Sequence, residues 1–277
     1  MRSAKFLAIL FVVALLLVTV IPAGAITDGQ LDGDGHPYVG IMIMRDAEGR
    51  WRCSGTLISP TVFLTAGHCT YGALDKVQIW FDSDIEQYKT PNPSGTGYIY
   101  TNGYPYEGEV SGTAYTHPLF NFPLYDVGVV VLDKPVKMSS YGALPTLNQL
   151  DALASKRGGQ DVTFIAVGYG MQESFPTAAG WQDVALKIRM VAYPKLNQIN
   201  VPGFTGDFSL LLSNNANTGG TCFGDSGGPN FLGSSNIVAA VTSYGINGNC
   251  AGTGGVYRMD RAEPLNWVKS FLGKKYQ

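Results

Sequence analysis

The sequence predicts an all-β protein. Glycine and proline are abundant, with 35 Gly and 15 Pro in 277 residues, whereas only 14% of the residues are charged. Short apolar runs recur between Gly, Pro, Asn and Asp residues, at 39–44, 56–64, 77–81, 127–132, 162–167 and 237–243. This composition and spacing are typical of short antiparallel strands joined by turns. With 45% hydrophobic residues, the chain can fill one large core or two small fused ones.

The N-terminus has the pattern of a secretory signal. Arg2 and Lys5 precede an apolar stretch at 6–21, and small residues follow at 22–25. The alternative is a retained membrane anchor, but the stretch is shorter than the roughly 20 residues that a spanning helix needs. We therefore expect residues 1–25 to be a cleaved signal peptide and the mature protein to be secreted, with no membrane contact after signal removal.

Net charge gives no reason to expect nucleic acid or an anionic membrane as a partner. The formal charge is −2 and the isoelectric point is near 5.9. An acidic stretch at 82–86 offers three carboxylates, too few for a calcium cage, and reads as a solvated face. No metal and no cofactor are expected.

The remaining segments complete the expected organisation. The polar segment 147–161 is the candidate link between two lobes, 26–150 and 151–277. Residues 91–112 read as a long surface loop, because they are rich in Gly, Tyr, Asn and Pro without clear periodicity. A short helical turn is expected after Ala66, and a helix at 263–272 is expected to dock on the second lobe.

Four cysteines in an exported chain are expected to be paired. The sequence allows three pairings. Pairing of neighbours, Cys53 with Cys69 and Cys222 with Cys250, would close two short loops, the first of roughly 15 residues and worth about 3 kcal/mol.

The densest chemical signal is Gly224-Asp225-Ser226-Gly227-Gly228-Pro229. Glycines around a serine allow a tight turn that exposes the hydroxyl of a nucleophile. They also allow the backbone amides of Gly224 and Ser226 to point into one small cavity, as an oxyanion hole requires. The structural alternative is an ordinary turn.

A nucleophilic serine needs a base and an orienting carboxylate. His68 follows the apolar run 62–64 in Thr65-Ala66-Gly67-His68-Cys69, whereas His36 and His117 each precede a proline and look like loop residues. Asp126 opens the apolar run 127–132; the alternative for it is a strand-edge charge, and Asp133 fits a turn better. We expect Ser226 to be the nucleophile, His68 the general base and acid, and Asp126 the orienting group.

The three motifs, in this order, resemble the signature blocks of the trypsin/chymotrypsin-like serine peptidases, the family in which the Ser-His-Asp mechanism is best described. The order His, Asp, Ser separates the chain from subtilisin-like and α/β-hydrolase enzymes. Further similar blocks are 53–58, 168–170, 243–245 and 255–257.

The resemblance implies two six-stranded antiparallel β-barrels, with the active site between them, and a short C-terminal helix, as one peptidase domain at 26–277. It also implies the neighbour pairing of the four cysteines. Bridges common in animal members are missing, which suggests a bacterial source.

The resemblance implies an activation pair and a specificity pocket. Ile26, at the new N-terminus, would pair with Asp225, so that signal removal itself would activate the enzyme. The pocket would have Gly220 at its base and Thr221, Ser243, Tyr244, Gly245 and Gly255 around it. Since no acidic residue lies there, we expect cleavage after large apolar or aromatic residues and not after Lys or Arg.

The expected function is a secreted serine endopeptidase that hydrolyses polypeptides through an acyl-enzyme. A monomer is expected, which could also bind protein inhibitors. Two alternatives remain: a catalytically silent family member that acts as a binding protein, and an esterase that spares peptides.

Overall fold

The computed structural model describes residues 26–154, 161–201 and 205–275. The expected signal peptide, 1–25, lies outside the described residues. Within them, no helix is both long and apolar enough to cross a membrane.

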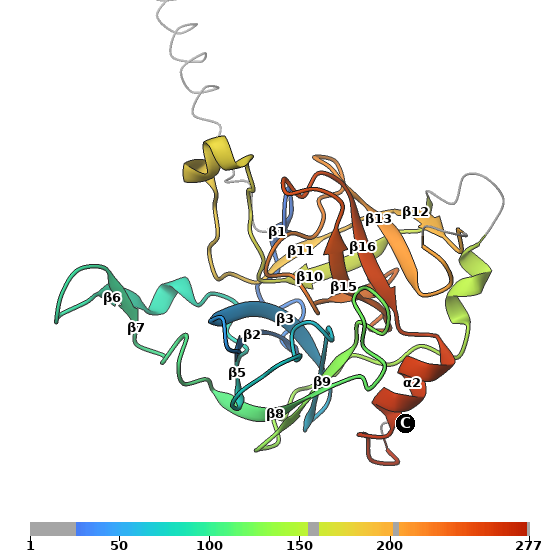
Figure 1. The fold of residues 1–277 in the computed structure, drawn as a ribbon, viewed down its shortest axis with the longest axis horizontal. Coiled ribbons are helices and arrows are strands. Elements are labelled where there is room, and N and C mark those ends of the chain that lie inside the picture. The colour runs from blue at the N-terminus through green and yellow to red at the C-terminus, as the bar shows by residue number, and fades with distance from the viewer. Residues whose placement is uncertain (1–25, 155–160, 202–204, 276–277) are drawn as a thin grey trace, which may run out of the picture.

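The first half of the chain forms a closed barrel. Its six antiparallel strands follow the order β2 (Val39–Arg45), β3 (Arg50–Ser59), β4 (Val62–Thr65), β9 (Gly128–Leu132), β8 (Val110–Thr116) and β5 (Val77–Trp80). Their side chains alternate between the barrel interior and its outside, and most of those in β2, β3, β4 and β9 are buried. In Figure 1 this barrel is the lower half of the molecule, coloured blue to green.

The second half of the chain, together with the N-terminal strand β1, forms a curled sheet of eight strands. Their order is β1 (Gln30–Leu31), β11 (Met190–Ala192), β10 (Phe164–Gly168), β14 (Pro229–Leu232), β15 (Val238–Gly245), β16 (Gly252–Arg258), β13 (Ser209–Asn214) and β12 (Leu196–Ile199). The sheet lies above the barrel in Figure 1. The predicted class, all-β with two lobes and one short C-terminal helix, is confirmed, although this second lobe is an open curled sheet of eight strands.

Within the described residues, helical structure is limited to short pieces. These are η1 (Glu86–Tyr88), η2 (Gln149–Leu153), η4 (Thr177–Gln182) and the C-terminal α2 (Ala262–Lys269). The segment after Ala66 is a series of turns.

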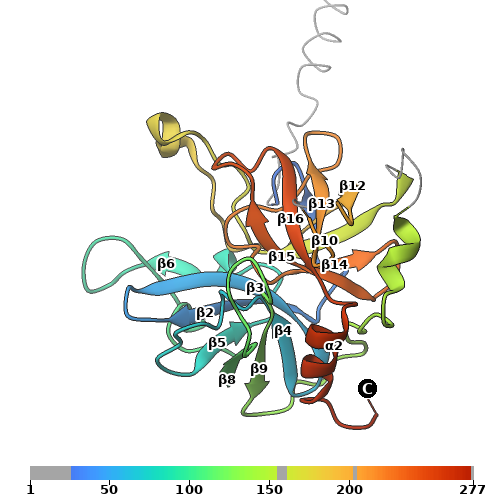
Figure 2. The same ribbon diagram turned by 45° about the vertical axis from the view of Figure 1, so that its right-hand side comes forward.

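The sequence analysis expected the C-terminal helix to dock on the second lobe. In the structure, α2 also packs against the first barrel (Figure 2). The ring of Trp267 lies 5.0 Å from that of His117, and the ring of Phe271 lies 5.2 Å from that of Tyr115 in β8. The C-terminus therefore ties the second half of the chain back to the first.

The segment 91–112 is more ordered than the expected surface loop. It contains most of a hairpin, β6 (Lys89–Pro91) with β7 (Tyr98–Tyr100), and then the start of β8. Two backbone hydrogen bonds also join the stem of this insertion to the second lobe, from Arg189 N to Ser83 O and from Ile85 N to Lys187 O. The insertion thus braces the two lobes against each other.

Candidate functional site

Strand pairing brings His68 and Asp126 together. His68 follows β4 by three residues, and Asp126 precedes β9 by two. Because β4 and β9 are antiparallel neighbours, with Thr65 opposite Gly128, the end of one lies beside the start of the other. The local sequence pattern, an apolar strand with a polar residue just beyond it, therefore places both side chains at one edge of the barrel.

The carboxylate of Asp126 holds His68 through two contacts. Its Oδ1 accepts the backbone N–H of His68 at 2.8 Å, and its Oδ2 lies 2.9 Å from Nδ1 of the imidazole. Asp126 is fully buried, whereas 28% of the His68 side chain is exposed. One end of the ring is thus fixed while the other end can reach a substrate.

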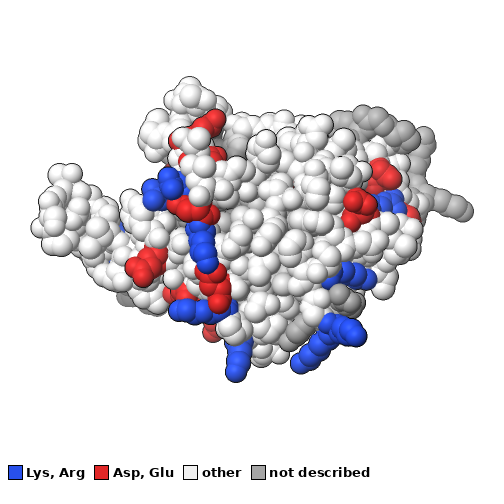
Figure 3. All heavy atoms as spheres, turned by 60° about the horizontal axis from the view of Figure 1, so that its bottom comes forward, with Lys and Arg blue, Asp and Glu red and all other residues white. Residues whose placement is uncertain are grey.

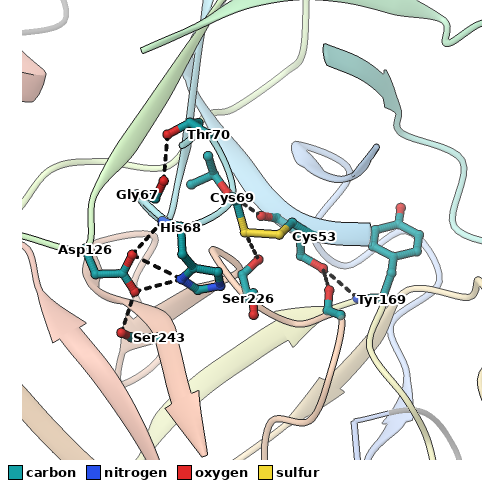
Figure 4. Close-up of a disulfide and its surroundings, with 12 residues drawn as sticks. Cys53, Gly67, His68, Cys69, Thr70, Asp126, Tyr169, Ser226 and Ser243 are labelled. Atoms are coloured by element: carbon teal, nitrogen blue, oxygen red, sulfur yellow. Dashed lines mark hydrogen bonds and ion pairs between the residues drawn. A yellow bond between two sulfur atoms is a disulfide. The ribbon is translucent and has the colours of Figure 1, made fainter. Parts of the chain in front are cut away.

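Ser226 lies beside this pair on a turn from the second lobe. The turn is fixed to β3, because Ser54 N donates to Ser226 O at 2.8 Å and Ser54 Oγ donates to Gly224 O at 2.9 Å. Figure 4 shows the imidazole of His68 directed from Asp126 toward Ser226. The side chains of His68 and Ser226 share no hydrogen bond in this structure. In enzymes without a bound substrate, such catalytic hydrogen bonds are often long.

The backbone amides of Gly224 and Ser226 have no acceptor among the described residues. Gly224 has φ of +98°, a conformation that favours glycine. Two free amides next to a nucleophile are the donors that a tetrahedral oxyanion needs.

Asp225, between these two residues, faces inward. Its Oδ1 accepts Gly170 N at 2.7 Å and its Oδ2 accepts Cys222 N at 2.9 Å. Complete burial nevertheless raises its pKa to about 7, and Arg52 opposes this shift. Among the described residues, the carboxylate forms no ion pair.

The segment around Ile26 is inserted into the second lobe. Ile26 is fully buried in a small cluster with Ala166, Met190 and Ala192. The next residue, Thr27, accepts Gly220 N at 3.0 Å through its carbonyl. Ala166 belongs to β10, whose end packs on the Asp225 carboxylate, so Ile26 and Asp225 lie in the same part of the interior.

A cavity of about 460 Å³ opens beside Ser226. Its walls combine aromatic rings, hydroxyls and the Cys222–Cys250 disulfide, and the lining includes no Asp, Glu, Lys or Arg side chain. The lining residues are His68, Phe122, Thr221, Cys222, Phe223, Ser226, Thr242, Ser243, Tyr244, Gly245, Asn247 and Cys250.

Two of the expected pocket residues, Gly220 and Gly255, do not line this cavity. The side chain of Asn214 fills the space beside Gly220, where a Cβ would lie 2.2 Å from its Cγ. The ring of Tyr244 covers Gly255 at the same distance. Gly254, one residue earlier, instead faces Thr221, with a Cβ position 3.2 Å from its hydroxyl oxygen.

The sequence analysis did not include Phe122, Phe223, Thr242 or Asn247 among the expected site residues. Phe122 precedes Asp126 by four residues, and its ring lies 5.7 Å from that of His68. No local sequence signal marks these positions, because Phe122, Phe223 and Asn247 reach the cavity through the packing of loops and Thr242 through its place in β15.

His117 lies in a loop, as expected, directly after β8, and it is buried, with 2% of its surface exposed. Its ring stacks on Tyr125 beside the Asp126 strand, and burial lowers its pKa. His36 contacts Asp32 through Nδ1 at 2.5 Å. Both histidines support the fold and lie outside the described cavity.

The structure contains the bridges Cys53–Cys69 and Cys222–Cys250. The first lies directly beside Ser226 in Figure 4. Cys53, His68 and Cys69 form one close group of metal-ligand atoms among the described residues, but both sulfurs are bonded in the disulfide and offer no thiolate.

Comparison with known proteins agrees with this architecture. The family model described as Trypsin matches residues 31–267. Brachyurin of Leptuca pugilator is 26% identical over 202 residues, which are 72% of this chain and 77% of that protein. Serine protease 1 of Drosophila melanogaster is 25% identical over 256 residues, 91% of this chain and 88% of that protein.

A solved structure titled HL collagenase has the same fold. Its TM-score is 0.65 at 20% identity, covering 89% of this chain and 98% of that one. The family match over most of the length shows that the chain belongs to the trypsin family of serine proteases, and that it is a trypsin/chymotrypsin-like serine endopeptidase.

Proposed function

We propose that the protein cleaves polypeptides through an acyl-enzyme formed on Ser226. His68 removes the hydroxyl proton as Ser226 attacks the scissile carbonyl, and later gives that proton to the leaving amine. Asp126 fixes the imidazole through Nδ1 and stabilises its cation. The observation that carries this assignment is the buried Asp126 carboxylate, 2.9 Å from a partly exposed His68 ring directed toward Ser226.

The amides of Gly224 and Ser226 stabilise the oxyanion in this scheme. Both donors are free among the described residues, and both lie in the turn that presents the nucleophile. Donors fixed before the reaction cost no reorganisation when charge develops.

Large apolar or aromatic side chains fit the cavity best, and Lys or Arg do not. The cavity volume of about 460 Å³ and its aromatic walls support the first half of this proposal. The absence of a carboxylate among the lining residues supports the second, because a buried cation would lack a counter-charge. Phe223 lines this cavity, and 55% of its surface is exposed.

Cleavage before Ile26 completes the site in this proposal. A new ammonium at Ile26 would provide the cation that Asp225 lacks, in a region where both residues are already buried. Removal of a secretory signal at 1–25 would generate that end and release a secreted monomer.

Polypeptides are the substrates that the family implies. The face in Figure 3 gives no support for a nucleic-acid partner, because most of it is uncharged and its largest group of charged side chains contains both signs.

The decisive experiment compares secreted wild type with Ser226→Ala. Intact mass and N-terminal sequencing identify the mature end, and cleavage sites are mapped on a denatured protein mixture. Wild type is expected to begin at Ile26 and to cut after aromatic or large apolar residues, whereas the variant is inert. If the Ser226→Ala variant also begins at Ile26, signal peptidase generates that N-terminus. If the variant keeps residues before Ile26, the active enzyme removes them itself.

Two outcomes contradict the proposal. If correctly processed wild type cuts no peptide, and an organophosphorus reagent also fails to label Ser226, the protein is a catalytically silent binding protein. Hydrolysis of esters without any hydrolysis of the matched amides would indicate an esterase.

A further inference from the structure

Arg52 of β3 lies directly against the turn that carries the oxyanion amides. A Cβ on Gly224 would lie 2.8 Å from Nε and 3.2 Å from Nη2 of Arg52, so the guanidinium contacts the backbone of Gly224. On its other side, Nη1 of Arg52 donates to the carbonyl oxygens of Ala185 and Leu186, at 3.2 and 3.4 Å. These two carbonyls belong to the loop with η4 at its tip, which projects from the second sheet in Figure 1.

The guanidinium keeps free donors. Nη1 makes the two carbonyl contacts, while Nε and Nη2 have no hydrogen-bond acceptor and no carboxylate partner among the described residues. Arg52 is also partly exposed to solvent. A planar cation with one free edge is a good partner for a carboxylate.

Among the described residues, no carboxylate forms an ion pair with Arg52. Desolvation raises the pKa of the buried Asp225 to about 7, and the charge of Arg52 only partly opposes this shift. Glu86, on the hairpin insertion, already pairs with Lys187 at 3.2 Å and Lys89 at 3.5 Å.

The position of Arg52 places it on the leaving-group side of the site. The cavity for the side chain before the scissile bond lies on one side of Ser226, between the segments 221–226 and 242–247. Arg52 does not line this cavity. It contacts Gly224, in the turn between the lining residues Phe223 and Ser226, and Ser54 of β3 is hydrogen-bonded to the same turn. A substrate chain that continues beyond Ser226 along this turn would pass β3.

We propose that Arg52 binds an Asp or Glu side chain located one or two residues after the scissile bond, so that the protease prefers to cut before acidic sequences. This inference rests on the proposed endopeptidase function and adds its leaving-group specificity. Gly224 also contributes to this position of Arg52, because the side chain of any larger residue would displace Arg52 from the turn.

The test uses internally quenched, C-terminally amidated peptides with one common residue before the scissile bond. Matched pairs carry Glu or Gln at the first or second position after the bond. We expect wild type to favour Glu at one of these positions by about 3- to 10-fold in kcat/KM at low salt, with a smaller preference at high salt.

Three variants separate charge from structure. Arg52→Gln should bring the Glu-to-Gln ratio to about one, and Arg52→Lys should keep part of the preference. Arg50→Gln is the matched control, because Arg50 lies two residues earlier on the same strand with its guanidinium over Tyr106, 4.7 Å from the ring centre, and it should keep the wild-type ratio. A p-nitroanilide substrate has no residue after the scissile bond. The Arg52→Gln substitution should therefore lower kcat/KM less for this substrate than for the Glu peptide.

Several results would overturn the inference: no charge preference in wild type, an unchanged preference in Arg52→Gln, or an equal loss on every substrate including the anilide. A wild type that cleaves the anilide without charge preference refutes this inference alone. A wild type that cleaves neither peptide nor anilide refutes the proposed function, and this inference falls with it.

Discussion

Ser243 donates its hydroxyl hydrogen to Oδ2 of Asp126 at 2.5 Å, across the boundary between the two lobes. Ser243 belongs to β15 of the curled sheet, whereas Asp126 precedes β9 of the barrel. The orienting carboxylate is therefore held by one donor from each side, the His68 backbone and the Ser243 hydroxyl.

Replacement of Ser243 by Ala should weaken catalysis more than the fold. A hydrogen bond to a buried carboxylate is worth about 1.5–3 kcal/mol. Because loss of this bond should disturb the orientation of His68, we expect kcat to fall roughly 10- to 100-fold. Steady-state kinetics on one peptide substrate measures this. Ser111→Ala is a matched control, because Ser111 makes the same kind of bond to the exposed Asp133 at 2.7 Å, far from His68. Equal kinetics for both variants would contradict the positioning role.

Gly170→Ala should disrupt the turn that carries the oxyanion amides. A Cβ at this position would lie 2.3 Å from Oδ2 and 2.8 Å from N of Asp225, where little can move. Overpacking of this kind costs about 1–3 kcal/mol, and we expect both the unfolding midpoint and kcat to fall. Gly248→Ala is the control, since a Cβ there meets nothing within 4 Å. A Gly170→Ala enzyme with wild-type kcat would show that the turn does not depend on this contact.

The buried Asp225 should make the uncut chain less stable as pH rises. Its pKa is raised from 3.8 to about 7, so between these values the folded chain holds a proton that the unfolded chain has lost. The free energy of unfolding therefore decreases with rising pH across this window, by up to about 1.4 kcal/mol per pH unit.

Urea unfolding of a chain that keeps the residues before Ile26, in a Ser226→Ala background, measures this effect from pH 4.5 to 6.5. Asp225→Asn in the same background should be less pH-dependent over this range, because the titrating group is gone. In the chain cut before Ile26 the decrease should be smaller, since an ammonium lowers the pKa of its partner. Parallel pH profiles for the chains with and without the Asp225→Asn substitution would refute the shift.

Local sequence was enough for the fold class and for the candidate triad. His68 and Asp126 lie just beyond apolar runs, which become the neighbouring strands β4 and β9, and Ser226 lies in a glycine-rich turn before β14. The structure brings the three residues together at the edge of the barrel. Their roles in catalysis remain a prediction.

Contacts between distant segments could not be predicted in this way. The sequence analysis placed Ser243 in a pocket wall, and its bond to Asp126 depends on how the lobes meet. The cover of Gly255 by Tyr244 follows from a register shift between β15 and β16, which no composition reveals. The docking of α2 on the first barrel depends on Trp267 and Phe271, which sequence periodicity alone does not assign to a partner.

The buried Arg189 and Asp32 should hold the N-terminal segment in place. Arg189 Nε donates to Asp32 Oδ2 at 2.8 Å, and both side chains are 1% exposed. The remaining donors of Arg189 reach the carbonyl oxygens of Gly33, Val39 and Phe81, so one side chain joins the segment after Ile26 to both lobes. Arg189→Met should therefore lower the free energy of unfolding by about 3–5 kcal/mol, because the buried Asp32 carboxylate then keeps only His36 as a side-chain partner.

The control for this last prediction is Arg45→Met. Arg45 pairs with Asp75 at 2.7 Å, but both side chains are exposed, so the loss should stay below about 1 kcal/mol. Arg189→Met with Asp32→Asn should be less destabilised than Arg189→Met alone, since no buried charge remains.

The pKa of Asp32 is lowered by His36 and Arg189 against the effect of burial. The contribution of Asp32 to the free energy of unfolding is therefore present above the usual pKa of 3.8, and it disappears as pH falls through the lower pKa of the folded chain. Urea unfolding at neutral and acidic pH tests both points; equal destabilisation by the Arg189 and Arg45 variants would show that burial adds nothing to the pair.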